Sequence, residues 1–492
     1  MRVRERRAAA AALLAATTLL AAGCGGGGGG SLPEGASVAP REASAFVAVN
    51  TDFSSEQWRE VTKLAARFPG TAQALAALEK QFRGLDFDRD VKPALGPEVD
   101  LVWLDFRNGG ADVVGLTKPD TKAKLEALVT KSKTPGGSGL VTAQVGEWVA
   151  VADSRAKIDR FESLAAGDKL AGDKGFKDAM RKLDPDSSAR VWVRGSTVQD
   201  LLDRALARAG AAPRITHEVG TLKSLAGFAT AGDAGARVDA DAVIDPEHHP
   251  TSYSPSLPDD VPAGAVLYLS FADLGAPTRI VLRMVSASLP NFETQLKQVE
   301  GVFGLTLEHD IYPLVKGEGG LAVYPGGRIP PILFLQKVSD EGKAEGLVRR
   351  FTAIAQLSGN VKTTTEEVAG VTLQKLTFPG DVTIWGGVTK RRLLVTNSVE
   401  LARDAISGPD HSLADERLYG SVRDAVGLPD KVSAFAFGDG KTGLPFVFRL
   451  AEQSGSVVPP AARANTKPLQ AALLYLRQEG DRVRVSGFVT IK

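Results

Sequence analysis

The stretch at residues 84–98, GLDFDRDVKPALGPE, constrains the architecture of this chain most, because a second version of it follows later. The second version is GLTLEHDIYPLVKGE, at residues 304–318. A long-range match of this kind predicts two similar structural units in tandem. Five positions are identical, and the members of each pair are 220 residues apart: Gly84 and Gly304, Leu85 and Leu305, Asp90 and Asp310, Pro93 and Pro313, and Glu98 and Glu318.

The residue types in this stretch predict its local structure. Gly84 is placed to end a preceding amphipathic helix, since glycine adopts the left-handed conformation found just after helix ends. Asp90 and Asp310 are placed to cap the next helical turn by accepting hydrogen bonds from free backbone N–H groups. A strand is then expected in each copy, at residues 99–106 and 320–324.

A metal-binding loop is the competing interpretation of the same stretch. Asp86, Asp88 and Asp90 form a D-x-D-x-D pattern. A calcium loop also requires glycine at its sixth position and a bidentate glutamate at its twelfth. Those positions hold Val91 and Pro97, and the second copy keeps just Asp310 of the three aspartates, with Thr306 and Glu308 at the other two positions. We therefore expect helix caps here and no metal site.

Composition and charge narrow the function classes. The chain has 492 residues, enough for two or more domains with sizeable cores. Its net charge of +1 gives no bulk attraction for nucleic acid. The single cysteine, Cys24, excludes an intramolecular disulfide and a cysteine-based metal site.

Residues 1–23 have the pattern of a secretion signal that ends at Cys24. A basic segment, MRVRERR, precedes a short apolar run and the sequence LAAGC. This resembles the lipobox of bacterial lipoproteins, in which the cysteine is lipidated and becomes the mature N-terminus. Ala21 stands where that motif usually has leucine. An ordinary secretory signal with a chance cysteine, or a twin-arginine signal at Arg6 and Arg7, are the alternatives.

Lipidation at Cys24 would place the protein on a membrane. A diacylglyceryl group supplies two acyl chains, which suffice for stable anchoring. We expect residues 24–40, rich in glycine, to form a flexible tether. The folded part is then held at the outer, extracytoplasmic face of the cell membrane. ATP and NAD are scarce there, so we expect no cofactor.

The rest of the chain is predicted to be α+β. Short alternating strands joined by tight turns favour antiparallel sheet, covered on one face by amphipathic helices. The first unit is expected at residues 41–246 and the second at 259–492, joined by a linker at 247–258 that is rich in proline and serine. Two separate domains and one continuous curved sheet are both compatible with this pattern.

Further correspondences support two similar units. Residues 45–49 correspond to 265–269, again 220 apart, whereas residues 148–154 correspond to 392–398, which are 244 apart. The additional 24 residues are predicted to form an extra hairpin within residues 361–388.

Three segments of the chain together resemble a known family. They are GLDFDRDVKPALGPE, the leading ASAFVAVNTD, and an amphipathic helix that ends in RFPG at Gly70. Over residues 40–492 the chain resembles the uncharacterised bacterial lipoprotein family called domain of unknown function 3352. The resemblance implies an exported location and a similar fold. It implies no activity and no catalytic residues.

Three short patterns imitate those of penicillin-binding proteins and β-lactamases. In chain order they are Ser154 with Lys157, Ser358 with Asn360, and Lys441 with Gly443. Ser154 corresponds to Ser398, which no lysine follows at that spacing, and both serines stand where a strand gives way to a helix. Helix caps explain both serines. We expect no enzyme, with a penicillin-binding-like serine hydrolase as a remote alternative.

Two other patterns are also expected to be structural. Residues 438–443 match G-x-G-x-x-G, but no suitable acidic residue and parallel βαβ context accompany them, so a glycine-rich turn is predicted. His248 and His249 lie in the linker without a third ligand nearby, which favours solvent-facing side chains over a zinc site.

The expected function is therefore non-catalytic: a membrane-anchored lipoprotein that binds a protein partner or supports an envelope assembly. The alternative is a carrier of a lipid or other apolar ligand. A deep apolar groove would favour the carrier, and a filled core with an exposed apolar patch would favour partner binding. One apolar helical face motivates the carrier, although core packing also explains it: Ile280, Val281, Met284, Val285 and Leu289.

Overall fold

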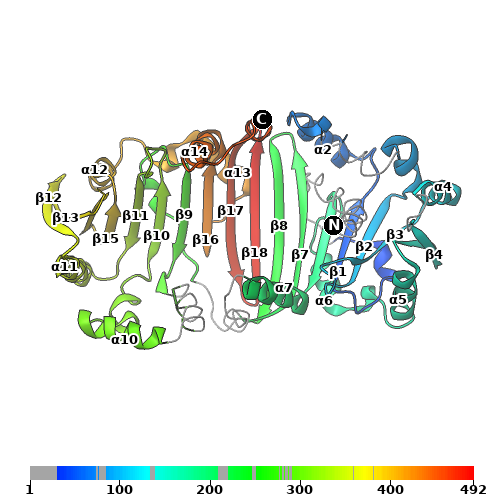
Figure 1. Ribbon diagram of the computed structural model, residues 1–492, viewed down its shortest axis with the longest axis horizontal. Helices are drawn as coiled ribbons and strands as arrows, with labels where there is room; N and C mark the ends of the chain where they lie inside the picture. The colour runs from blue at the N-terminus through cyan, green and yellow to red at the C-terminus, as the bar shows by residue number, and fades with distance from the viewer. Residues whose placement is uncertain are drawn as a thin grey trace.

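The computed structural model shows an elongated α+β protein (Figure 1). Several residues singled out in the sequence lie outside the described part of the chain: Cys24, Gly84, His248, His249, Ser358 and the five residues of the apolar face at 280–289. The structure describes residues 30–73, 76, 85–132, 139–208, 220–245, 251–275, 278–279, 282, 286, 291–357, 359–380 and 382–492.

The strands form one continuous 18-stranded sheet, and neighbouring strands are antiparallel. This confirms the α+β prediction, and it decides between two separate sheets and a single one. Across the sheet the order is β4-β5-β3-β2-β1-β6-β7-β8-β18-β17-β16-β9-β10-β11-β15-β14-β13-β12. The first eight strands are β1 Ala45–Asn50, β2 Glu98–Asp105, β3 Asp112–Thr117, β4 Val141–Val145, β5 Trp148–Ala152, β6 Ala189–Arg194, β7 Thr221–Gly232 and β8 Gly235–Asp245.

The remaining strands continue the sheet from its middle to its far end. They are β9 Leu267–Ala272, β10 Glu318–Val323, β11 Ile332–Lys337, β12 Lys362–Val368, β13 Val371–Phe378, β14 Val382–Thr389, β15 Arg392–Thr396, β16 Ala434–Asp439, β17 Leu469–Glu479 and β18 Arg482–Ile491. The longer helices are α2 Glu56–Ala66, α4 Lys122–Ser132, α5 Arg155–Ala165, α6 Lys174–Met180, α7 Gly195–Arg208, α10 Phe292–Phe303, α11 Glu341–Leu357, α12 Val399–Ser407, α13 Arg417–Val426, α14 Gly440–Gln453 and α15 Pro460–Thr466.

The same order of strand pairings occurs in both halves of the chain. β1 lies between β2 and β6, and β9 lies between β10 and β16. Ala48 pairs with Asp100, and Ser270 pairs with Gly320. Since residues 100 and 320 are 220 apart, β1 and β9 correspond at a spacing of 222. The predicted match of residues 45–49 with 265–269 was therefore wrong by two residues, a shift that keeps the same face of the strand inward.

The halves are joined edge to edge by their last strands. β8 pairs with β18 along its length, so the sheet continues across the junction (Figure 1). Asp239 faces Ser486 in this pairing, and both side chains are buried. Backbone pairing removes the exposed edge that each half would otherwise present.

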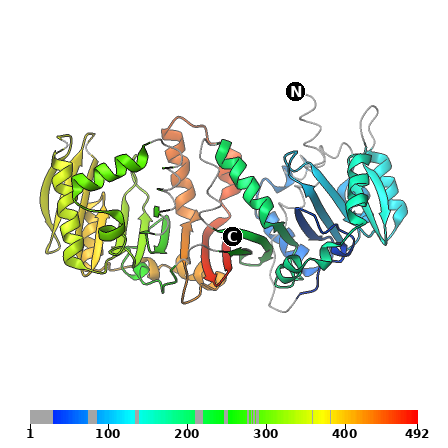
Figure 2. The same cartoon turned by 90° about the horizontal axis from the view of Figure 1, so that it is seen from below.

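Helices pack on both faces of the sheet, which corrects the prediction that one face would be covered (Figure 2). Around β5, Trp148 and Ala150 belong to a core with α5, whereas Val149 packs with α4 on the opposite face. Successive strand residues point to opposite faces. The uninterrupted apolar run of β5 therefore reflects burial on both sides.

The chain just before each half is packed, not loose. Between residues 30 and 40, η1 Glu34–Ser37 places Ala36 and Ala39 in the first core, so this part of the predicted tether is folded. Before the second half, Tyr253 bridges to Val432, and Leu257 in η5 Leu257–Asp259 is fully buried. Residues 251–258 of the predicted linker are therefore part of the second half.

One local prediction is confirmed and another needs correction. The hairpin predicted within residues 361–388 is formed by β13 and β14, and β12 adds a third strand at the far end of the sheet. Residues 438–443 are not a turn: β16 ends at Asp439 and α14 begins at Gly440. Asp439 Oδ1 accepts from the Thr442 N–H at 3.0 Å, so a helix cap explains the glycine-rich pattern.

Candidate functional site

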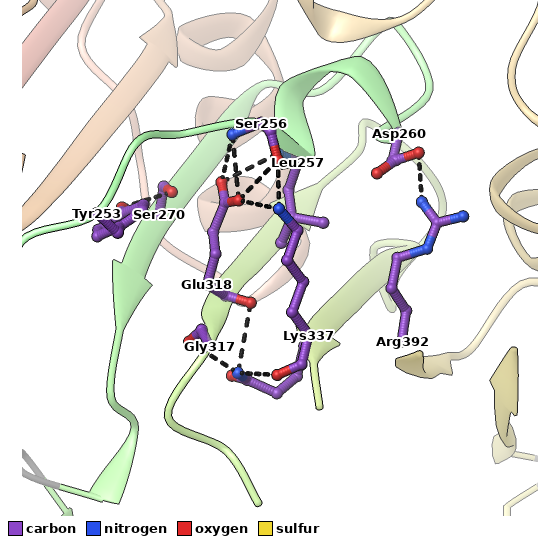
Figure 3. A network of polar contacts seen from close by, with 10 residues as sticks. Tyr253, Ser256, Leu257, Asp260, Ser270, Gly317, Glu318, Lys337 and Arg392 are labelled. Carbon is purple, nitrogen blue, oxygen red and sulfur yellow. Dashed lines mark hydrogen bonds and ion pairs between the residues drawn. The ribbon is translucent and has the colours of Figure 1, made fainter. Parts of the chain in front are cut away.

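Two corresponding glutamates hold the segments that lead into the two halves. Glu98, at the start of β2, accepts from the N–H groups of Glu34 at 2.8 Å and Gly35 at 3.4 Å. Glu318, at the start of β10, accepts from Ser256 at 2.9 Å and Leu257 at 3.0 Å (Figure 3). A carboxylate that accepts several backbone N–H bonds fixes the incoming chain against the sheet.

Glu318 is the more completely neutralised of the two. Lys337 Nζ lies 2.9 Å from Glu318 Oε2 and also donates to the Ser256 hydroxyl (Figure 3). Beside this network the hydroxyl groups of Tyr253 and Ser270 lie 2.7 Å apart. The Glu318 carboxylate therefore has backbone, hydroxyl and ammonium partners, and the network acts as a structural clamp (Figure 3).

The environment of Glu98 is different, because a second acid lies behind it. Asp100 is fully buried, and within the described residues neither of its carboxyl oxygens has a hydrogen-bond partner. Burial, and then the nearby Glu98, raise the pKa of Asp100 well above its ordinary value. Burial also raises the pKa of Glu98, although Arg190 lies 3.8 Å away and acts in the opposite direction.

A cavity of about 260 Å³ opens beside Glu98. Its floor is made of buried residues, among them Ala48, Trp148 and Arg190, while its rim is exposed. The cavity is small next to the roughly 300–1,000 Å³ of typical ligand pockets. The full lining is Glu34, Ala48, Asn50, Asp52, Pro97, Glu98, Lys118, Trp148, Pro185, Ser187 and Arg190.

The corresponding place in the second half is occupied by aromatic side chains. Strand registers place Phe435 where the first half has Arg190. The rings of Tyr268 and Phe435 pack 5.6 Å apart, and Tyr253 reaches Ser270, which stands at the position of Ala48. The backbone arrangement is shared, and the side chains decide whether it encloses a cavity.

Each copy of the repeated stretch contains a single π-helical turn, and its N-cap is not the residue that the sequence predicted. Asp86 accepts from the Arg89 N–H at 2.8 Å, and Thr306 accepts from the His309 N–H at 3.2 Å. These residues are the N-caps, so the assignment of that role to Asp90 and Asp310 was wrong. Asp90 and Asp310 instead reach back to the N–H groups of the caps, at 3.0 and 2.7 Å.

The residues of the hydrolase-like patterns are dispersed. Ser154 is the residue before α5, but its side chain makes no capping hydrogen bond, so the predicted cap was wrong for this serine; Lys157 Nζ contacts Asp153 at 2.8 Å. Lys441 lies in α14, which follows β16. Eight strands separate β5 from β16, or about 40 Å at ordinary strand spacing. Ser398 accepts from the Leu401 N–H, as expected of a helix cap.

Two kinds of feature are absent from the described residues. Within those ranges, no group of three or more histidine, cysteine, aspartate or glutamate side chains is placed to hold a metal ion. Over the same residues, no helix combines the length and the apolar character needed to cross a membrane.

Comparison with known proteins places the chain in a family. The model of a family of proteins of unknown function, DUF3352, matches residues 117–435. The chain belongs to the DUF3352 family. The match spans strands from both halves, including β5, β8, β9 and β15. No curated protein matches the chain.

The similar solved structures share little sequence with this DUF3352 member. Crystal form IV of TP0453 is 12% identical, with a TM-score of 0.27, and the match covers 49% of this chain and 94% of that one. Crystal form III of TP0453 is also 12% identical, with a TM-score of 0.26 and coverage of 49% and 95%.

Sequence reasoning singled out Glu98 and Glu318 as identical positions but missed the residues around them. Asp100 carried a readable signal, because it alternates with Val102 and Leu104 and therefore shares their buried face of β2. Arg190 and Lys337 gave no comparable signal. They come from strands 92 and 19 residues beyond their glutamates, and pairing alone brings them close.

Proposed function

We propose that this chain is a non-catalytic lipoprotein, anchored through Cys24 at the outer face of the cell membrane, which binds a protein partner in the envelope. The signal-like N-terminus supports the anchor, and the packing of residues 30–40 shortens the tether. Six peptide steps from Cys24 to Gly30 reach at most about 20 Å. The folded body would therefore lie close to the membrane surface.

The two halves are proposed to descend from a tandem duplication. The repeated stretch supports this origin, and so does the recurrence of the pairing order in β1–β8 and β9–β18. Joining at β8 and β18 would then pair a strand with its own counterpart. A duplicated unit that closes its edge in this way extends the sheet without exposing a new edge at the junction.

Exposed apolar residues on α10 and α11 carry the partner-binding proposal. The exposed fraction is 75% for Val302 on α10 and 84% for Leu357 on α11. The C-terminal end of α10 lies against α11, where Arg350 donates to the carbonyl of Gly304 at 3.3 Å. Exposed apolar side chains on two neighbouring helices suit a protein-interaction surface.

The alternative, a carrier of an apolar ligand, has weaker support. The cavity beside Glu98 is small and lined by charged groups, whereas acyl chains need an apolar lining. Native mass spectrometry of the chain from Ser31 onward, purified from its own envelope, separates the two functions. A reproducible extra mass that extracts into organic solvent would establish a carrier and displace the partner-binding proposal.

Two experiments test the main proposal. Replacing Cys24 with serine should move the protein from the membrane fraction to the soluble fraction, and an unchanged distribution would refute the lipid anchor. A photo-crosslinker at Val302 or Leu357 should capture one defined envelope protein in intact cells. The matched control is a crosslinker at exposed Gln453 on α14. Equal capture at all three positions would refute the α10–α11 surface.

A further inference from the structure

The cavity beside Glu98 has an excess of negative charge. Its lining includes three carboxylates, Glu34, Asp52 and Glu98, and two cationic side chains. Lys118 is engaged elsewhere, 2.5 Å from Glu147, whereas Arg190 donates to the carbonyl of Ser31 at 2.6 Å and also lies 3.8 Å from Glu98. Arg190 therefore offsets part of the charge of Glu98, while the three carboxylates of the lining still outnumber its two cationic side chains.

Asp100 adds a buried acid directly behind this wall. It follows Glu98 by two residues on the same face of β2, and its cross-strand neighbour Ala48 lines the floor. A carboxyl group without a hydrogen-bond partner is an unfavourable choice for a purely structural core. A positive charge brought up to Glu98 would favour the ionised form of that carboxyl group.

The second half shows that the fold does not require this cavity. The same clamp exists there around Glu318, but Gly320 takes the place of Asp100 and Phe435 that of Arg190. Tyr253 and Tyr268 fill the space with aromatic rings. The two halves share the backbone arrangement, but aromatic side chains fill the space in the second half, whereas the first half has an open, acidic cavity. This difference indicates that the cavity has a role.

The shape of the cavity limits what can bind. A volume of about 260 Å³ suits a molecule with a handful of non-hydrogen atoms rather than a peptide or an acyl chain. Pro97, Trp148 and Pro185 supply apolar surface next to the carboxylates. Methylene groups can pack on these side chains, and an aromatic ring near a cation adds a favourable interaction.

We infer that this cavity binds a small organic cation, with its ammonium group against the carboxylates of Glu98, Asp52 and Glu34 and its methylene groups against Trp148. The site goes beyond the partner-binding function, and either one can fail without the other. The chemistry that selects the ligand is a primary amine on a short aliphatic chain.

Isothermal titration calorimetry with 1,4-diaminobutane, on the chain from Ser31 onward, tests the inference. The diamine should bind at a single site, and 1,4-butanediol, which has the same length without charge, should bind at least tenfold more weakly. Glu98→Gln keeps an acceptor for the clamp but removes the charge, so it should weaken binding at least tenfold. Ala48→Leu should abolish binding by filling the floor of the cavity.

The matched control is Glu318→Gln, which changes the corresponding clamp where aromatic rings fill the space. It should leave binding of the diamine unchanged, and thermal unfolding should show that each variant is folded. The inference is overturned if the folded wild-type chain binds no diamine at millimolar concentration. Equal binding of the diol, or an equal effect of Glu98→Gln and Glu318→Gln, would also overturn it.

Discussion

Ser486 donates a hydrogen bond to Asp239 across the junction of the two halves, with Oγ and Oδ1 2.5 Å apart in a buried setting. The two residues pair directly between β18 and β8. Asp239 is also held by Arg237, whose Nε lies 2.6 Å from Oδ2. The Asp239 carboxylate, at the junction of the two halves, therefore has both a hydrogen-bond donor and an ion-pair partner.

Replacing Ser486 with alanine should destabilise the whole chain. The change removes a buried hydrogen bond to a charged group, which is worth about 1.5–3 kcal/mol. Urea unfolding measures the loss, and Ser421→Ala, at an exposed position on α13, is the control with an expected change within about 0.5 kcal/mol. Equal stability of the Ser486 variant and wild type would show that the junction does not depend on this bond.

Asp100→Asn should make the protein more stable at neutral pH. The raised pKa of Asp100 means that the folded state keeps a proton which the unfolded chain loses above about pH 4. The free energy of unfolding of the wild type must then fall as the pH rises from about 4 through the folded pKa. The variant lacks this fall and should gain about 1–3 kcal/mol at pH 8, the scale of an unsatisfied buried polar group.

The measurement for Asp100 is urea unfolding at pH 4 and pH 8. The gain should be present at pH 8 and much smaller at pH 4, where the folded state keeps its proton and the unfolded state is about half protonated. Asp245→Asn, at an exposed carboxylate that ends β8, should show no such difference. A gain of the same size at both pH values would contradict titration of Asp100 as its cause.

Glu318→Ala should cost more stability than Glu98→Ala. Glu318 is 4% exposed and accepts from two backbone N–H groups, a hydroxyl and Lys337, so its loss should cost about 2–4 kcal/mol. Glu98 is half-buried with weaker contacts, and about 1–2 kcal/mol is expected. Amide hydrogen exchange should speed up at Glu34 in one variant and at Ser256 in the other.

Asp86→Ala and Thr306→Ala should have similar and additive effects. Each removes the N-cap of a corresponding helical turn, at a cost of about 0.5–2 kcal/mol. The two sites lie in different halves, so the double variant should lose the sum of the single losses. Thermal unfolding of the three variants tests this. A clear departure from additivity would mean that the two turns are coupled.

Much of the local structure could be predicted from residue patterns. The strand predicted at residues 99–106 is β2, which begins and ends one residue earlier, and the strand predicted at residues 320–324 is β10, which begins at Glu318. These elements follow from the periodicity of apolar side chains, which is a local property. The prediction of the N-cap in the repeated stretch was wrong because Asp86 and Asp90 are both suitable acceptors. The geometry of the turn makes Asp86 the cap, and Asp90 accepts from the N–H group of Asp86.

The cavity could not be predicted, although its residues were in view. The repeated stretch identified Glu98, and Asp100 lies two positions further along the same strand. Arg190 lies near Glu98 because β6 pairs with β1, which the local sequence does not indicate. Trp148 arrives from β5. A site assembled from four strands depends on their order in the sheet, which the sequence of any one strand does not specify.

The sequence by itself determined the antiparallel α+β character, the strands near residues 99–106 and 320–324, and the extra hairpin within residues 361–388, because each depends on local patterns. The tertiary structure alone decided that β8 and β18 join the halves, that both faces are covered, and that one clamp encloses an acidic cavity while the other is filled. The physical reason is the separation in sequence of the residues involved. Periodic patterns depend on residues that are close in the chain, whereas strand pairing and packing join residues that are far apart in the chain and meet only on folding.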